Sequence, residues 1–246
     1  MKINNYNVDS SKIFLRSSNK GVSYGGFHRK RIGAWNKCKN WRGIHTCGEC
    51  GGFFGIDKKF HSFGITLHRS TVEMCEWRGN RIPIDHNKIC VSEYRVVAID
   101  EDIPDYIFNQ CGYKVLKNGG YVNKISSGEL IVFGGEIGRI SGGYQYFYGK
   151  SYIGNTKISS GVQLFFDRSS AGNAEITGGG QYFYDESSAG EAEIANGFQY
   201  FCNKSSGGNA KITGGVQHFW DKSSIGNAKV SGGRQKSGNG PLSTKS

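Results

Sequence analysis

The chain has 246 residues, with 31 Lys and Arg against 20 Asp and Glu, 38 glycines, 3 prolines and 7 cysteines. Few prolines and an apolar content of 37% exclude a disordered or collagen-like chain. No apolar run is long enough for a membrane-spanning helix, and the first residues lack the apolar core of a secretory signal. Because an odd number of cysteines favours a reducing compartment, we expect a cytoplasmic protein of a bacterium or host cell.

Composition divides the chain near residue 120. Residues 1–120 hold 14 glycines, six of the seven cysteines, 19 basic and 11 acidic residues; residues 121–246 hold 24 glycines, one cysteine, 12 basic and 9 acidic residues. The sequence therefore predicts a basic, cysteine-containing α+β domain over 1–120, an all-β solenoid over 121–235 and a flexible tail over 236–246.

A basic and aromatic segment lies near the start of the N-terminal domain. Residues 28–42 carry six Lys or Arg and two Trp without an acid. Such a segment suits a phosphate backbone with an indole stacked on a base, while the alternative is a solvated loop whose tryptophans belong to the core. The nucleic-acid candidates are Arg29, Lys30, Arg31, Trp35, Lys37, Lys39 and Trp41.

The next segment contains a candidate metal site. Cys47-Gly48-Glu49-Cys50 is a Cys-x-x-Cys pair of the kind that holds Zn²⁺. The candidate ligands are Cys38, His45, Cys47 and Cys50, and His61 or Cys75 are further options for the fourth position. Because a second Cys-x-x-Cys pair is missing, ordinary thiols and a redox pair remain alternatives to zinc.

The rest of the domain predicts short elements. Strands are expected at 65–67, 82–84 and 93–99, a short helix over Thr71–Trp77, and a turn at 100–104 leading into Tyr106-Ile107-Phe108.

Two resemblances rest on the Gly43-Ile44-His45 element, the strand that follows and Ile103-Pro104-Asp105-Tyr106-Ile107. This arrangement resembles uncharacterised phage domains that precede solenoid repeats, and it also resembles the ADP-ribosyl-transfer fold. The second resemblance implies that His45 and Arg42 grip NAD or a phosphate, with Glu93 as the acid. The alternative for His45 is a histidine satisfied beside a turn. No nucleophile elbow, phosphate loop or zinc-protease motif is present.

The C-terminal half is an 18-residue repeat. Each unit holds two short alternating runs separated by Gly- or Ser-rich corners, which predicts a parallel β-solenoid of about five coils. The recurring residues include Gln145, Gln163, Gln181, Gln199, Gln217 and Gln235, and Phe147, Phe165, Phe183, Phe201 and Phe219. A degenerate unit precedes them around 121–141.

In the second strand of each coil, Ala174 and Ile176 alternate with Glu175, so the Ala and Ile columns are expected to face inward and the Glu175 column to face water. The first strand of each coil is apolar on both faces. If the Phe column is buried, the two flanking columns face outward and form an aromatic stripe about 24 Å long at a coil spacing of about 4.8 Å. The stripe then includes Tyr146, Tyr148, Phe166, Tyr182, Tyr184, Tyr200 and Trp220. Another part of the chain or a second copy could cover this stripe, and the functional alternative is a surface that binds a protein or a sugar.

The pattern Gly-Gly-x-Gln-x-Phe followed by Gly-Asn-Ala-x-Ile, over about 142–235, resembles the passenger repeats of AIDA-type autotransporters. Those repeats form β-helical adhesin stalks, so the resemblance implies a solenoid used for display and interaction. Short solenoids of this kind also occur in phage and mobile-element proteins.

The sequence thus predicts a non-enzymatic interaction or structural protein of phage or mobile-element type. We expect the N-terminal head to close the open end of the solenoid, and the aromatic stripe to bind a protein partner or a second copy. The alternative is an ADP-ribosyl-transfer-like enzyme or a nucleic-acid-binding protein that acts through the basic head. Neither hypothesis involves a membrane, and zinc is the one cofactor that the sequence indicates.

Overall fold

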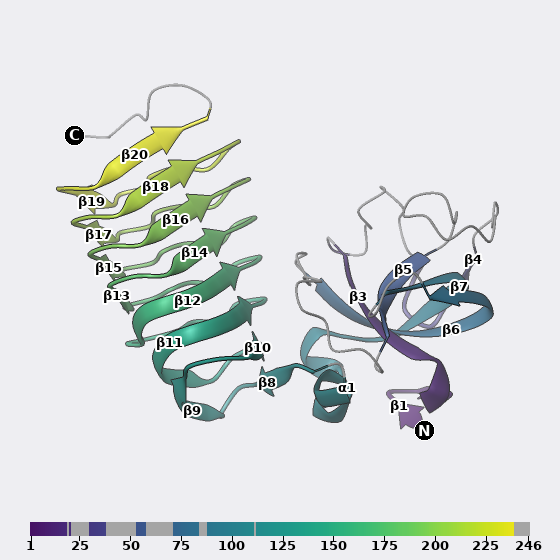
Figure 1. The fold of residues 1–246 in the computed structure, drawn as a ribbon. Coiled ribbons are helices and arrows are strands. Elements are labelled where there is room, and N and C mark those ends of the chain that lie inside the picture. The colour runs from purple at the N-terminus through teal and green to yellow at the C-terminus, as the bar shows by residue number, and fades with distance from the viewer. Residues whose placement is uncertain are drawn as a thin grey trace. The chain divides into compact units, whose positions relative to one another are not determined.

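The computed structural model describes residues 1–18, 20, 30–37, 53–57, 71–83, 88–110 and 112–238. The chain forms two compact units, Met1–Tyr113 and Lys114–Ser246 (Figure 1). The second unit therefore begins a few residues before the compositional boundary at 120. Within the described parts of the chain, no helical segment has the length and apolar character needed to traverse a bilayer.

The described part of the N-terminal unit is mainly antiparallel β-structure. A small hairpin of β1 (Lys2–Ile3) and β2 (Tyr6–Asn7) precedes the short 3-10 helix η1 (Ser10–Lys12). The main sheet has the order β4 (Asn36–Lys37), β7 (Lys88–Ile99), β5 (Phe53–Asp57), β3 (Ile13–Ser18) and β6 (Thr71–Pro83). Because β6 also pairs with β7, the strands β3, β5, β6 and β7 form a small closed sheet. The 3-10 helix η2 (Asp100–Asp102) and the helix α1 (Asp105–Gln110) follow β7.

The helix predicted over Thr71–Trp77 is wrong, because this segment lies in strand β6. It pairs with β3 on one side and with β7 on the other, and its first six residues are all buried. Pairing on both sides overrides the local helical preference. The strand predicted at 93–99 is confirmed within β7, whereas the segment at 106–108 forms α1. The strand predicted at 65–67 lies outside the described residues.

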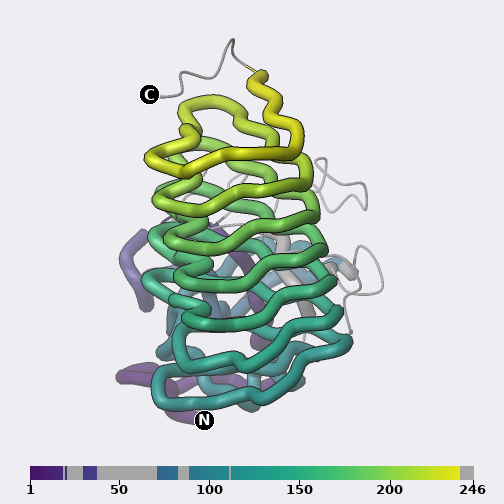
Figure 2. The backbone as a smooth tube through the Cα atoms, turned by 90° about the vertical axis from the view of Figure 1, so that its left-hand side faces the viewer, coloured from purple at the N-terminus to yellow at the C-terminus, as the bar shows by residue number. Residues whose placement is uncertain are grey.

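The C-terminal unit is a parallel β-solenoid of about seven turns (Figures 1 and 2). One face, the Phe sheet, contains β8 (Lys114–Leu116), β10 (Glu129–Val132), the second halves of β11 (Glu136–Phe147) and β12 (Lys157–Phe165), β14 (Gly180–Phe183), β16 (Phe198–Phe201), β18 (Val216–Phe219) and β20 (Arg234–Ser237). The other face, the Ile sheet, contains β9 (Tyr121–Ile125), the first halves of β11 and β12, β13 (Glu175–Ile176), β15 (Glu193–Ile194), β17 (Lys211–Ile212) and β19 (Lys229–Val230).

The solenoid has more turns than the five coils predicted, because its first turns are shorter. In these turns Lys114 pairs with Leu130, and Leu130 pairs in turn with Gln145. Both spacings along the sequence are shorter than the spacing between Gln145 and its next partner, Gln163. The regular period of the repeat begins with this pair. A search for that regular period therefore misses the first turns, although their strands stack in the same parallel way.

The interior of the long coils is built from columns of identical residues. The Phe column is fully buried, and its neighbouring rings stack with centroids 4.6 to 4.7 Å apart. The predicted Ile and Ala columns of the Ile sheet are also buried. These columns form one continuous apolar core along the solenoid.

The Gln column is buried as well and forms an amide ladder. Each Gln donates from Nε2 to Oε1 of the Gln in the preceding coil at 2.8 Å, from Gln163 back to Gln145 and so on to Gln235. The same Nε2 groups donate to a carbonyl of the preceding corner in their own coil, as Gln217 does to Gly214 at 2.9 Å. Both amide protons are thus satisfied, which makes a buried polar column compatible with a stable core.

Two backbone positions explain the residue choice at the corners. At the corner that follows each Phe-sheet strand, the backbone φ lies between +54° and +62° in Asp167, Asp185, Asn203 and Asp221. Gly149 occupies the same column with a φ of +65°. Asp, Asn and Gly are the residues that tolerate this left-handed conformation. At the opposite corner, a Cβ added to Gly215 would lie 2.6 Å from the carbonyl oxygen of Gly197 in the preceding coil, so only glycine fits there.

The last coil is polar. In β20, Arg234, Lys236 and Ser237 stand where β18 has Val216, His218 and Phe219. Lys236 and Ser237, which the sequence assigned to a flexible tail, belong to a paired strand. Charged residues on a terminal strand oppose end-to-end stacking of solenoids.

Candidate binding face on the solenoid

The outer faces of the two sheets differ in chemistry. The Ile sheet exposes a charged column, with ion pairs between Lys157 and Glu175 at 3.0 Å and between Lys211 and Glu193 at 3.7 Å. The Phe sheet exposes aromatic side chains over its later coils. We call this set the aromatic face; it consists of Tyr182, Tyr184, Phe198, Tyr200, His218 and Trp220.

Ring contacts hold the aromatic face together. Phe198 lies at its centre, with its ring centroid 6.1 Å from that of Tyr182 and 5.1 Å from that of His218. Tyr200 lies 6.0 Å from Tyr182 and 6.4 Å from Trp220. Trp220 is 41% exposed, and the other members are half-buried. These rings sit on paired strands, so they form a flat, pre-ordered surface.

Three residues of the predicted stripe do not belong to this surface. Tyr146, Tyr148 and Phe166 are each only 1% exposed. Tyr148 packs against Phe133 at 5.6 Å and stacks on Phe166 at 5.1 Å, because the preceding short turn supplies an aromatic neighbour. Tyr146 is flanked in the sheet by two buried residues, Ile131 and Leu164. The prediction was therefore wrong for the first coils of the stripe.

The sequence reasoning also missed Phe198. Phe198 stands in a column that holds Tyr144, Val162, Gly180, Val216 and Arg234 in other coils, so an aromatic residue does not recur there from coil to coil. The signal that could have found it is the alternation along β16, where Phe198 and Tyr200 point to the same side of the sheet.

Three side chains in and beside this face, Tyr184, Tyr200 and Cys202, are held in their neutral forms. Burial raises the pKa of Tyr184 to about 12 and also raises the pKa of Tyr200. Burial, together with the hydrogen bond to Asp221, raises the pKa of Cys202 to about 11; its Sγ donates to Oδ2 of Asp221 at 3.1 Å. Tyr184, Tyr200 and Cys202 thus stay protonated at neutral pH, which favours apolar contacts over nucleophilic chemistry at these residues.

In the N-terminal unit, part of the predicted nucleic-acid segment has structural partners. The Trp35 ring lies 4.0 Å from the Arg78 guanidinium and 5.1 Å from that of Arg95. Lys37 forms an ion pair with Glu93 at 3.8 Å, and Arg78 contacts the same carboxylate at 2.8 Å. Lys30 and Arg31 are exposed. Arg29, Lys39 and Trp41 lie outside the described residues.

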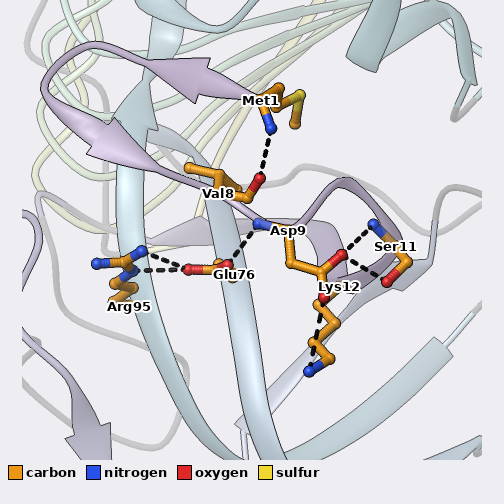
Figure 3. A network of polar contacts seen from close by, with 7 residues as sticks. All are labelled: Met1, Val8, Asp9, Ser11, Lys12, Glu76 and Arg95. Atoms are coloured by element: carbon orange, nitrogen blue, oxygen red, sulfur yellow. Dashed lines mark hydrogen bonds and ion pairs between the residues drawn. The ribbon is translucent and has the colours of Figure 1, made fainter.

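A polar network fixes the N-terminal hairpin to the closed sheet (Figure 3). The Glu76 carboxylate accepts from the Asp9 backbone N–H at 2.7 Å and from Arg95 at 2.7 Å. Arg95 also donates to the backbone carbonyl of Asn7 at 2.7 Å. Hydrogen bonds from Ser11 to the Asp9 carboxylate lower the pKa of Asp9. The arrangement anchors the N-terminal chain end to the sheet.

The candidate catalytic and metal residues Arg42, His45, Cys38, Cys47 and Cys50 lie outside the described residues. Within the described ranges, no group of three or more His, Cys, Asp or Glu is placed to hold a metal ion. Cys75, an optional fourth ligand, is a buried thiol in β6. Cys90 is in a disulfide, which differs from the reduced cysteines that the odd count had suggested.

Comparisons with protein-family models, with curated proteins and with solved structures give no match.

Proposed function

We propose that the solenoid is a non-catalytic binding module whose aromatic face takes up a partner protein. The observation that carries this proposal is the contrast between its two sheets. The outer face of the Ile sheet is charged, whereas the outer face of the Phe sheet presents contiguous half-exposed rings on a rigid backbone. Aromatic residues are enriched and charged residues depleted at the centres of protein interfaces.

The positive charge at the C-terminal end of the aromatic face favours a foreign protein over a second copy. The columns of the aromatic face end in Arg234 and Lys236. Between Val162 and Gly238 these columns contain no Asp or Glu, so the aromatic rings of a second copy would not form ion pairs with the two cations. A partner with an apolar centre and an acidic rim would satisfy both features.

A binding module agrees with the resemblance of the repeats to AIDA-type display repeats and to phage or mobile-element solenoids. The N-terminal unit is proposed as an α+β domain that accompanies the module. The enzymatic and nucleic-acid alternatives depend on Arg42, His45 and Trp41. The described neighbours Trp35, Lys37 and Glu93 have structural roles, and this favours the binding module.

The test compares two triple variants of the full chain. Tyr182→Ser, Tyr200→Ser and Trp220→Ser together remove the centre of the aromatic face, while Lys157→Ser, Glu193→Ser and Lys211→Ser together form the matched control on the Ile sheet. A partner isolated with the wild-type chain is purified and its dissociation constant is measured for all three proteins. We expect the control to bind like wild type, and the aromatic variant to lose affinity by about a hundredfold or more.

Two results would overturn the proposal. One is a partner whose affinity is unchanged by the aromatic triple variant. The other is a wild-type mass of twice 27.0 kDa in light scattering that reverts to a monomer in the aromatic variant, which would assign the face to a second copy.

A further inference from the structure

A cavity lies where the turn length of the solenoid changes. The two short turns pass from the Phe sheet to the Ile sheet through residues 117–120 and 133–135, whereas the long coils have a longer corner at this place. The first long corner, which starts at Gly149, therefore adjoins a shorter turn. The resulting cavity of about 810 Å³, which we call the notch, is lined by residues 118–121, 134–138, 150–155 and 173.

Two tyrosines in the notch are the most exposed large apolar side chains of the described chain. Tyr121 is 62% exposed and Tyr152 is 49% exposed. Tyr152 is a departure from the repeat, since the later coils have Ser170, Ser188, Ser206 and Ser224 in this column. Its ring packs directly on the backbone of Gly172, where an added Cβ would be 2.3 Å from the ring carbon Cε2.

The polar groups of the notch are available to a ligand. Five polar side chains that line the notch are exposed: Asn118, Glu136, Lys150, Asn155 and Asn173. Within the described part of the chain, these side chains make no hydrogen bond or ion pair with one another or with other residues. One carboxylate and one ammonium group balance in charge. A phosphate would meet a single cation beside a carboxylate, and a purely apolar ligand would bury the amides without partners.

We propose that the notch binds a neutral saccharide. A pyranose ring presents a C–H face, which packs on an exposed aromatic ring, and a rim of hydroxyl groups, which need donors and acceptors in several directions. Tyr121 and Tyr152 would supply the ring contacts. The amides of Asn118 and Asn155 and the Glu136 carboxylate would bind the hydroxyl groups. The notch is formed by the corners between the two sheets, so this site is separate from the aromatic face.

The experiment uses an array of neutral, sialylated and sulfated glycans probed with the full chain, followed by calorimetric titration with each purified oligosaccharide that binds. We expect neutral glycans to bind. Tyr152→Ser should weaken binding by about tenfold or more, and Tyr121→Ala should have a similar effect. Tyr152→Ser is the informative variant, because serine already occupies this column in four later coils and the fold accommodates it. Tyr200→Ser, on the aromatic face, is the matched control and should bind like wild type.

Three results would overturn the inference. The first is an array without a neutral glycan that binds. The second is binding confined to sulfated or sialylated glycans. The third is an unchanged dissociation constant in both Tyr121→Ala and Tyr152→Ser, with circular dichroism confirming that the variants are folded. None of these results depends on the partner of the aromatic face, so the two proposals fail separately.

Discussion

The long coils and the first turns of the solenoid share one backbone arrangement but have different interiors. In the long coils a Gln and a Phe from every turn stack on their counterparts, whereas the first turns have Leu130 and Val132 at these positions. Parallel stacking therefore does not require the ladder. The comparison indicates why the inward columns repeat: each buried residue stacks on, or hydrogen-bonds to, the same type of residue in the next coil. The outward columns vary because their side chains contact water or a ligand instead.

The largest expected effect comes from the Phe column. Phe183→Ala removes a ring stacked on both sides, at 4.6 and 4.7 Å, and should lower the free energy of unfolding by about 3–5 kcal/mol. Val132→Ala at the same column in a short turn should cost about 2 kcal/mol, because fewer buried methyl groups are lost. Urea unfolding followed by circular dichroism measures both. Equal losses would contradict the larger contribution that is expected of the Phe column.

The amide ladder gives the next effect. Gln199→Leu leaves Oε1 of Gln181 without its donor and Nε2 of Gln217 without one acceptor, so the loss should be about 2–3 kcal/mol. Gln145→Leu, at the start of the ladder, breaks one such bond beside Leu130 and should cost about 1 kcal/mol. The same unfolding measurement applies, and a harmless Gln199→Leu would contradict the structural role of the ladder.

The corner column separates backbone strain from side-chain contacts. Asp185 has φ of +57°, so Asp185→Ala should destabilise the chain by about 1 kcal/mol. Asp185→Asn should be nearly neutral, since Asn203 already occupies this conformation in the next coil. Thermal unfolding of the two variants provides the check. A neutral alanine variant would remove the conformational explanation for the recurring Asp and Asn residues.

The smallest effect concerns Glu129 in the first turns. Burial raises the pKa of Glu129 to about 7 from an ordinary value of 4.5, so the folded chain holds this proton more tightly than the unfolded chain. Stability should therefore be highest below pH 4.5 for this group and fall as the pH rises to about 7. Glu129→Gln should remove that slope and stabilise the chain by about 1 kcal/mol at pH 8, because part of the side chain remains in water. A parallel pH profile in both proteins would contradict this assignment.

Most of the solenoid fold could be predicted from the sequence, but little of the candidate binding face could. The regular period of the repeat predicted parallel stacking, and the alternation Ala174, Ile176 against Glu175 predicted which side of the Ile sheet is buried. It could not decide the Phe sheet, where both faces are apolar. The buried amide ladder resolves that ambiguity, because a Gln column satisfies itself only when identical coils lie in register.

Features that do not repeat along the sequence were not predicted from it. Thr71–Trp77 became a strand because β3 and β7 pair with it from distant parts of the chain. Phe198 joined the aromatic face from a column that does not repeat, and the notch arose from a change of period. Each depends on which segments meet in space, which local spacing does not specify.

The most direct test of the account is the thermal unfolding midpoint of the Tyr182→Ser, Tyr200→Ser, Trp220→Ser variant beside that of Phe183→Ala. If the aromatic face is a binding surface on an independently stable core, the triple variant should unfold cooperatively within about 5 °C of wild type, since exposed cross-strand pairs contribute little. Phe183→Ala should lose about 10 °C or more. A triple variant that falls as far as Phe183→Ala would contradict the account, because the face would then belong to the core.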